Sequence, residues 1–213
     1  MPVGIGRRFM LGVSAAAAFA ASLDIRLARA DADPAIIQPI QGLYDALLTV
    51  MKEGTKTPFG QRFNSLAPAV DRALDMATIL EVSVGSMWST LSPDQHEALY
   101  EAFRSYTINS YLSNFNSYTG QRFVIEPNLR AVGAEQVVQT KIVPASGDPH
   151  ALDYVMRQTG AGWKAVDVLA DGTISRVATQ RSDFRSLVMR GGGDMLLASL
   201  KKKAADLATQ AGA

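Results

Sequence analysis

The chain has 213 residues, with 21 Lys and Arg against 20 Asp and Glu, and it contains no cysteine. A charge balance this close to zero, with Lys201-Lys202-Lys203 as the dense basic run, argues against nucleic acid as a partner. The absence of cysteine excludes a disulfide and a cysteine-linked lipid anchor.

The first thirty residues have the three-part layout of a secretory signal peptide. Arg7 and Arg8 precede an Ala-rich apolar stretch over residues 10–21, and Ala28-Arg29-Ala30 fits a small-residue cleavage site. The apolar stretch is shorter than the roughly 20 residues that cross a bilayer. We therefore expect residues 1–30 to be removed and the remainder to be a soluble periplasmic protein. The paired arginines fit a twin-arginine signal as well as an ordinary secretory one.

Three helical segments are predicted next. From Pro34 to Glu53, apolar residues recur three and four positions apart and so share one helical face. The same spacing follows Pro58, and a third segment runs through to Trp88. Each apolar face needs a packing partner.

The clearest helix start is the tetrapeptide SPDQ. Ser92 is predicted as the N-cap, Pro93 takes the first helical position and Gln95 completes a capping box. We expect this helix to run to about Asn116. Its large aromatic residues are Phe103, Tyr106, Tyr111 and Phe115.

The pattern then changes to the alternation typical of β-strands. Four strands are predicted, over residues 121–127, 135–144, 151–159 and 163–169. Pro127 and Pro144 are expected to end the first two, and the Gly-Ala-Gly at 160–162 supplies a tight turn between the last two. Such short connections predict an antiparallel meander. The chain is therefore predicted to be α+β, with helices over about 34–118 and a sheet over about 120–170.

Helical spacing returns near Arg181 and continues to about Ala208, which closes a single predicted domain over 31–208. Gly191-Gly192-Gly193 interrupts it, and Asp194 is predicted to cap the second helix. The triplet follows no strand and lacks the Lys-Ser/Thr of a phosphate-binding loop, which favours a helix break over a phosphate site.

No group of residues predicts a reaction or a metal centre. The chain lacks the G-x-S-x-G motif of serine hydrolases, and its two histidines, His96 and His150, are predicted to be ordinary surface residues. Zinc would need clustered histidine, cysteine or carboxylate ligands, which the sequence does not offer. We expect no cofactor and no enzyme active site.

Large apolar side chains are numerous around the predicted sheet. They either complete a solid core or line a cavity, and composition alone favours the core. The residues in question are Trp88, Phe103, Tyr106, Tyr111, Phe115, Tyr154, Met156 and Trp163.

The C-terminal stretch resembles the signature of the toluene-tolerance or MlaC family of periplasmic lipid carriers, in which a strand leads through a Gly-Ser turn to two helices separated by glycine. The matching positions are Trp163, Lys164, Asp167, Gly172, Ser175, Arg181, Ser182, Phe184, Gly193, Leu196, Leu197 and Leu200. Upstream, the central helices resemble the family at Gly85, Trp88, Gln95, Phe103, Tyr111 and Tyr118. The turn between Gly172 and Ser175 is longer than usual, and this part is most similar to the hopanoid-associated HpnM branch.

This resemblance implies a fold similar to nuclear transport factor 2, in which helices wrap a curved four-stranded antiparallel sheet, with a helical extension and an enclosed apolar cavity. It also implies a non-catalytic protein that carries a phospholipid or hopanoid between the inner and outer membranes. The partners implied are an inner-membrane lipid transporter and an outer-membrane complex.

On the same basis, we expect two sets of site residues. The expected lipid-binding set is Trp88, Phe103, Tyr106, Tyr111, Phe115, Tyr154, Val166 and Val168. A second set is expected to position the cavity wall without catalysis: Asp167 on the last strand, Gly172 turning the chain, Arg181 capping or pairing near that turn, and Phe184 packing the next helix onto the sheet.

Two other functions stay open. Folds of this type also serve steroid isomerases, and Asp167 with Tyr154 or Tyr106 would be the candidate catalytic pair in an apolar pocket. The third possibility is a transporter adaptor with a filled core, which the absence of any cavity would favour.

Overall fold

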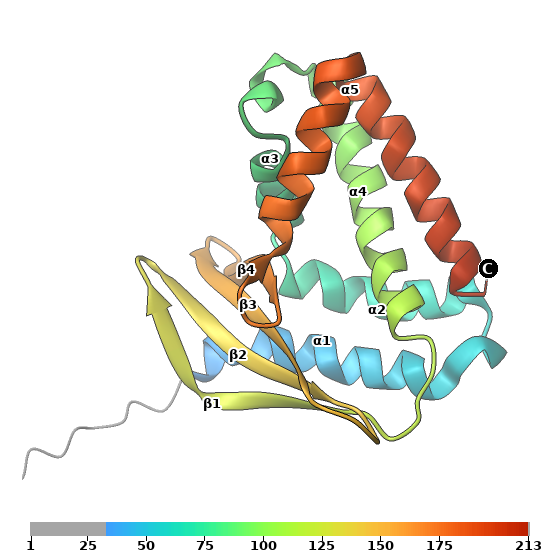
Figure 1. The fold of residues 1–213 in the computed structure, drawn as a ribbon, viewed down its shortest axis with the longest axis vertical. Coiled ribbons are helices and arrows are strands. Elements are labelled where there is room, and N and C mark those ends of the chain that lie inside the picture. Colours follow the sequence, from blue (N-terminus) through green and yellow to red (C-terminus); the bar gives the residue numbers. More distant parts are fainter. Residues whose placement is uncertain (1–32, 213) are drawn as a thin grey trace, which may run out of the picture. The chain divides into compact units, whose positions relative to one another are not determined.

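The computed structural model describes residues 33–212, which fall within one compact unit, Asp31–Ala213. The predicted signal peptide and its cleavage site lie outside the described residues. The elements that follow occur in the predicted order of helices, then strands, then helices (Figure 1).

Three α-helices and two short 3-10 helices form the first part of the unit. They are α1 (Pro34–Glu53), η1 (Gly54–Lys56), α2 (Phe59–Ala73), α3 (Met76–Val84) and η2 (Gly85–Thr90). The third helix was predicted to reach Trp88 but ends at Val84. Gly85 adopts φ 72°, a left-handed backbone conformation that stops the α-helix and that glycine adopts at little cost.

Helix α4 (Pro93–Asn114) begins at the predicted capping box. The Ser92 hydroxyl accepts a hydrogen bond from the Gln95 backbone N–H at 3.2 Å, and the Gln95 side-chain oxygen accepts one from the Ser92 N–H at 3.1 Å. Two of the N–H groups that a helix start leaves unpaired are thus satisfied.

The sheet is antiparallel and has five strands in the order β1-β2-β3-β4-β5. They are β1 (Arg122–Val132), β2 (Glu135–Val143), β3 (His150–Thr159), β4 (Gly162–Ala170) and β5 (Ile174–Ser175). The prediction of four strands was wrong, because positive φ angles at Asp171 and Gly172 turn the chain back so that Ile174 pairs with Ala170.

Pro127 does not end β1, contrary to the sequence prediction. The register of β1 against β2 shifts between Ile125 and Leu129, so Pro127 lies in an irregular stretch of an edge strand. Proline is tolerated there because the missing N–H would not have donated to a ladder partner.

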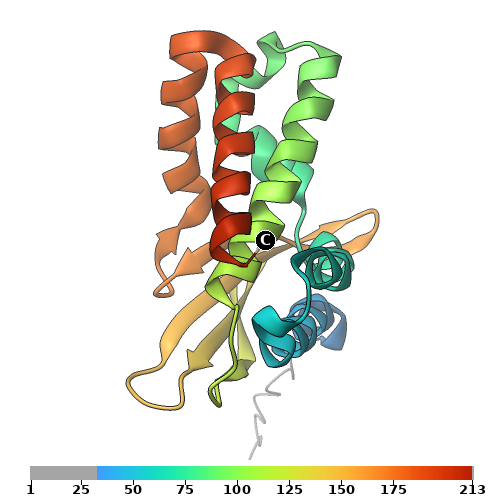
Figure 2. The same ribbon diagram turned by 90° about the vertical axis from the view of Figure 1, so that its right-hand side faces the viewer.

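Helix α5 (Arg176–Gln210) starts before the predicted Arg181, because Ser175 caps it by accepting the Ala178 N–H. The predicted break is confirmed: Gly191 (φ −157°, ψ 26°) and Gly192 (φ 65°, ψ −164°) are not helical. The chain folds back there into two arms, residues 176–190 (the first arm) and 193–210 (the second arm), which run side by side (Figure 2).

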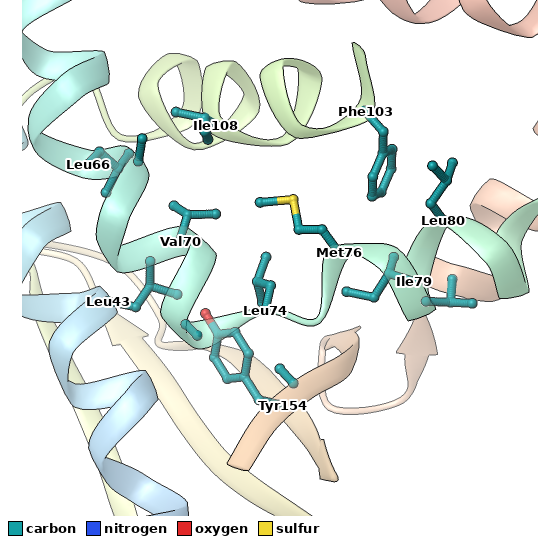
Figure 3. Packing of buried hydrophobic residues seen from close by; sticks show 14 of the residues in the cluster. Leu43, Leu66, Val70, Leu74, Met76, Ile79, Leu80, Phe103, Ile108 and Tyr154 are labelled. Carbon is teal, nitrogen blue, oxygen red and sulfur yellow. The ribbon is translucent and has the colours of Figure 1, made fainter. Parts of the chain in front are cut away.

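The helices pack in two groups. Helix α1 contacts the sheet and α2, whereas α4 packs against α5, and α5 also contacts α3 (Figures 1 and 2). The two arms of α5 use different contacts on α4: Phe184 of the first arm packs edge-on against Phe103, and the Asn109 amide donates to the Ala204 carbonyl of the second arm at 2.9 Å. One apolar core connects both groups (Figure 3).

Candidate functional site

A cavity of about 370 Å³, partly open to solvent, lies between α4, the start of α5, α3 and the sheet. Its volume falls at the lower end of the roughly 300–1,000 Å³ of small-molecule pockets. The lining residues are Leu74, Met76, Ile79, Phe103, Tyr106, Thr107, Ser110, Tyr111, Asn114, Phe115, Ile142, Leu152, Asp167, Val168, Ala170, Arg176, Val177 and Gln180.

One face of α4 forms the helical wall of this cavity. Phe103, Tyr106, Thr107, Ser110 and Tyr111 all line it, and their spacing of three and four residues places them on the same side of the helix. Phe103 is buried and points toward α3 (Figure 3). The other four lining residues, Tyr106, Thr107, Ser110 and Tyr111, are half-exposed. The wall therefore changes from a closed apolar end to an open, mixed end.

Three neighbouring strands form the floor. Ile142 of β2, Leu152 of β3 and Val168 of β4 line the cavity. Leu152 lies opposite Ala170 in the β3–β4 ladder, and Tyr154 lies opposite Val168. The floor presents aliphatic side chains, which suit an apolar ligand.

Asp167 fixes the start of α5 against the sheet. One carboxylate oxygen accepts the N–H of Val177 at 3.1 Å and that of Val168 at 2.7 Å, and the other accepts the Ser175 hydroxyl. The carboxylate thus satisfies the Val177 N–H at the helix start, and its negative charge interacts favourably with the positive end of the helix dipole. Because Val177 lines the cavity, Asp167 positions part of the wall.

A polar rim was missed by sequence reasoning. Thr107, Ser110 and Asn114 on α4 and Arg176 and Gln180 on α5 all line the cavity. The α4 members follow Phe103 by four, seven and eleven residues, which is the spacing of one helical face. That spacing could have predicted them, but the sequence prediction considered only the aromatic residues of this helix. The rim makes the cavity amphipathic, with an apolar floor and a polar opening.

The structure brings together five of the eight expected binding residues. The five that line the cavity are Phe103, Tyr106, Tyr111, Phe115 and Val168. Trp88 does not line it. Trp88 lies in η2 and stacks on His96 with ring centroids 4.0 Å apart, because the helix that was expected to carry it had already ended.

The same contact corrects the expectation for His96, which is half-buried, since its imidazole both stacks on Trp88 and hydrogen-bonds to the Trp88 carbonyl at 3.0 Å. His150, by contrast, is exposed at the start of β3, as predicted.

Val166 is buried but is absent from the lining. Between Val155/Met156 and Asp167/Ala165 the β3–β4 register shifts by one residue, which leaves Val166 as the extra residue of a bulge. The bulge breaks the alternation that had placed Val166 and Val168 on one face.

Tyr154 also lies outside the lining, in the packed core beside Leu74 (Figure 3). Its ring meets Tyr44 of α1 edge-on, with centroids 6.0 Å apart, and its hydroxyl is buried without a hydrogen-bond partner among the described residues. Because α1 covers this part of the sheet, the Tyr154 side chain belongs to the core and does not line the cavity.

Burial keeps three tyrosines in this region neutral. It raises the pKa of Tyr44 to about 12, although a hydrogen bond with Thr140 acts in the opposite direction. Burial likewise raises the pKa of Tyr111 and of Tyr154 above their usual values, with the neighbouring phenols adding to the rise for Tyr154. These phenols therefore stay neutral near neutral pH.

The remaining wall residues are placed as follows. Gly172 turns the chain with φ 70°, as expected. Arg181 does not reach that turn, because α5 starts earlier and carries it beyond the first helical turn. Its guanidinium lies over Gly85 instead, with Nε 3.4 Å from the position of a Cβ there. Phe184 packs edge-on against Phe103 of α4.

Within residues 33–212, no three His, Cys, Asp or Glu side chains gather as a metal site would require. None of the helices in that part of the chain combines the length and apolarity needed to cross a bilayer.

Helices packed on an antiparallel sheet around a cavity with an apolar floor and a few polar residues form the kind of pocket that is typical of small-molecule-binding proteins. Sequence comparison names the family: the model of the MlaC protein family matches residues 41–202, and the chain belongs to that family of non-catalytic periplasmic lipid carriers. The isomerase alternative built on Asp167 is thereby set aside.

A solved structure supports the fold. The phospholipid-binding protein from Ralstonia solanacearum, determined in complex with a phospholipid, superimposes with a TM-score of 0.70 at 23% sequence identity. The match covers 81% of this chain and 98% of the Ralstonia chain. The two proteins therefore share their mixed helix and antiparallel-sheet architecture.

Proposed function

We propose that this protein binds a phospholipid in the cavity between α4, α5 and the sheet, and carries it across the periplasm between the inner and outer membranes. The observation that supports this most is the amphipathic lining, in which an apolar floor is bordered by a polar rim. Family membership and the phospholipid in the Ralstonia relative point to the same ligand class.

The energetic argument explains why a carrier needs such a cavity. Each methylene removed from water contributes about 0.8 kcal/mol, so an acyl chain of about a dozen methylenes costs on the order of 10 kcal/mol to leave exposed. The aliphatic floor and the Phe103 end of the α4 wall can cover an acyl chain, while the rim lets a polar headgroup keep its contact with water.

A carrier also has to exchange its cargo. We propose that an inner-membrane lipid transporter and an outer-membrane complex are the exchange partners, and that residues 1–30 direct export and are removed. N-terminal sequencing of the protein recovered from a periplasmic extract tests the export step, with Asp31 as the expected first residue.

Native mass spectrometry of protein purified from the periplasm, followed by lipid extraction, tests the binding proposal. The expected result is one phospholipid per chain, identified by its mass and fragmentation. A hopanoid of the same stoichiometry would assign the HpnM-like cargo instead. An unliganded mass that persists after incubation with vesicles of either lipid would refute carriage and favour a transporter adaptor.

A further inference from the structure

The rim of the cavity carries an unpaired positive charge. Arg176, the first residue of α5, is exposed and also lines the cavity, so it stands at the opening. It is the single cation among the described lining residues, and no ion pair or hydrogen bond of its side chain occurs within residues 33–212. An arginine without a partner at a binding site is available for an anion.

The acidic residue of the lining does not neutralise this charge. Asp167 is the single carboxylate among the described lining residues, and its oxygens are taken by the N–H groups of Val168 and Val177 and by the Ser175 hydroxyl. The Asp167 carboxylate is therefore already used to hold the start of α5. The guanidinium of Arg176 therefore remains open to a ligand.

Hydroxyl groups of α4 line the same cavity. Thr107 and Ser110 lie three residues apart on the cavity face, and both hydroxyls can donate. The Asn114 amide is already used, because it donates to the Ser110 carbonyl at 2.8 Å. The rim thus combines a guanidinium on one wall with hydroxyl donors on another, a donor set that suits an oxyanion with several acceptor oxygens.

The charge of Arg176 acts on groups inside the cavity. Burial raises the pKa of the lining residue Tyr111, and the positive charge of Arg176 acts on that pKa in the opposite direction. Because Arg176 and Tyr111 both line the cavity, one ligand can contact both.

We propose that Arg176, together with the hydroxyls of Thr107 and Ser110, binds the phosphate of a lipid headgroup at the cavity opening. This inference rests on the proposed function, because it requires the acyl chains to occupy the apolar floor. Arg176 would then select for phospholipids over neutral lipids with the same acyl chains. The guanidinium can form two parallel hydrogen bonds to phosphate oxygens, which a neutral side chain cannot replace.

The test compares two fluorescent ligands that differ only in the headgroup, namely a phosphatidylglycerol and a diacylglycerol with identical labelled acyl chains. Arg176→Gln is measured beside Arg185→Gln, an exposed arginine on the same arm that does not line the cavity. We expect Arg176→Gln to raise the Kd for phosphatidylglycerol about tenfold. Diacylglycerol binding should stay within about twofold, and Arg185→Gln should change neither Kd.

Each other outcome overturns the inference in a recognisable way. An unchanged phosphatidylglycerol Kd, or equal losses for both ligands with a lowered unfolding temperature, would show that Arg176 does not recognise phosphate. Displacement of phosphatidylglycerol by millimolar inorganic phosphate would assign the rim to free phosphate. If the native protein bound neither lipid, the proposed function would fail as well, which distinguishes that case from the loss of headgroup selectivity alone.

Discussion

The carboxylate of Asp167 on β4 accepts the backbone N–H of Val177, the second residue of α5, at 3.1 Å. The same side chain binds Ser175, which in turn caps α5 through the Ala178 N–H at 2.9 Å. A strand and the helix that follows the turn are thereby joined where the helix begins to form the cavity wall.

Replacing Asp167 should loosen this wall. We expect Asp167→Ala to lower the free energy of unfolding by about 1–2 kcal/mol, because the Val177 N–H of α5 and the Ser175 hydroxyl lose their acceptor. Lipid affinity should fall with it. Chemical denaturation measures the change, with Arg181→Ala as a control that should stay within about 0.5 kcal/mol. Equal destabilisation by both variants would contradict this account of Asp167.

Two valines two residues apart should respond differently to the same change. Val168→Arg places a cation on the half-exposed cavity floor and should weaken lipid binding about tenfold or more while the protein stays folded. Val166 is buried at 8% exposure in the bulge, so Val166→Arg should lower the unfolding temperature. Thermal unfolding and bound-lipid content separate the two, and the reverse pattern would place Val166 in the cavity.

The break in α5 depends on a glycine backbone conformation. Gly192 has φ 65° and ψ −164°, a region that costs other residues about 1–3 kcal/mol, so Gly192→Ala should destabilise the protein by that amount. Gly42, in the middle of α1, has no atom within 4 Å of an added Cβ. Gly42→Ala should therefore raise stability by up to about 1 kcal/mol. Urea denaturation of the two variants would refute this view if they shifted in the same direction.

Stability should fall at alkaline pH through the buried phenols. The pKa of Tyr44 rises from about 10 in the unfolded chain to about 12 in the folded protein. The folded state therefore holds the proton more tightly between these values. The contribution of the protonated Tyr44 phenol to the free energy of unfolding is therefore complete below about pH 10, and it is lost as pH rises toward about 12.

The variant that checks this is Tyr44→Phe. It should lose about 1 kcal/mol near neutral pH, because the hydrogen bond with Thr140 is removed, and its stability should decline less steeply above pH 10. Tyr118→Phe, at a position 42% exposed, serves as the control. Identical alkaline profiles for the native protein and Tyr44→Phe would contradict the role of Tyr44.

Periodicity and capping rules predicted most of the elements, and six of the eighteen residues that line the cavity were among the site residues expected from the family resemblance. The Ser92 capping box and the spacing from Phe103 to Phe115 were readable because helix starts and helix faces are local properties. The errors arose where one residue changes a register. The bulge at Val166 and the irregular stretch around Pro127 depend on the partner strand, which a single stretch of sequence does not contain.

The positions of Trp88 and Tyr154 were unpredictable for a different reason. Both are aromatic, and the rings that they pack against, those of His96 and Tyr44, come from other elements. Whether an aromatic side chain fills a core or lines a cavity depends on which surfaces pack over it, and hydrophobicity does not distinguish the two cases.

The break at Gly191 and Gly192 also affects the order in which the protein can form during synthesis. The lining of the cavity begins at Leu74 and is not complete until Gln180, while the second arm that returns to α4 follows the break. A chain still emerging from the ribosome therefore has α4 packed on α3 while the side of Phe103 that later meets Phe184 is still uncovered. Long-range closure of this kind forms late and leaves apolar surface open to aggregation until α5 has been synthesised.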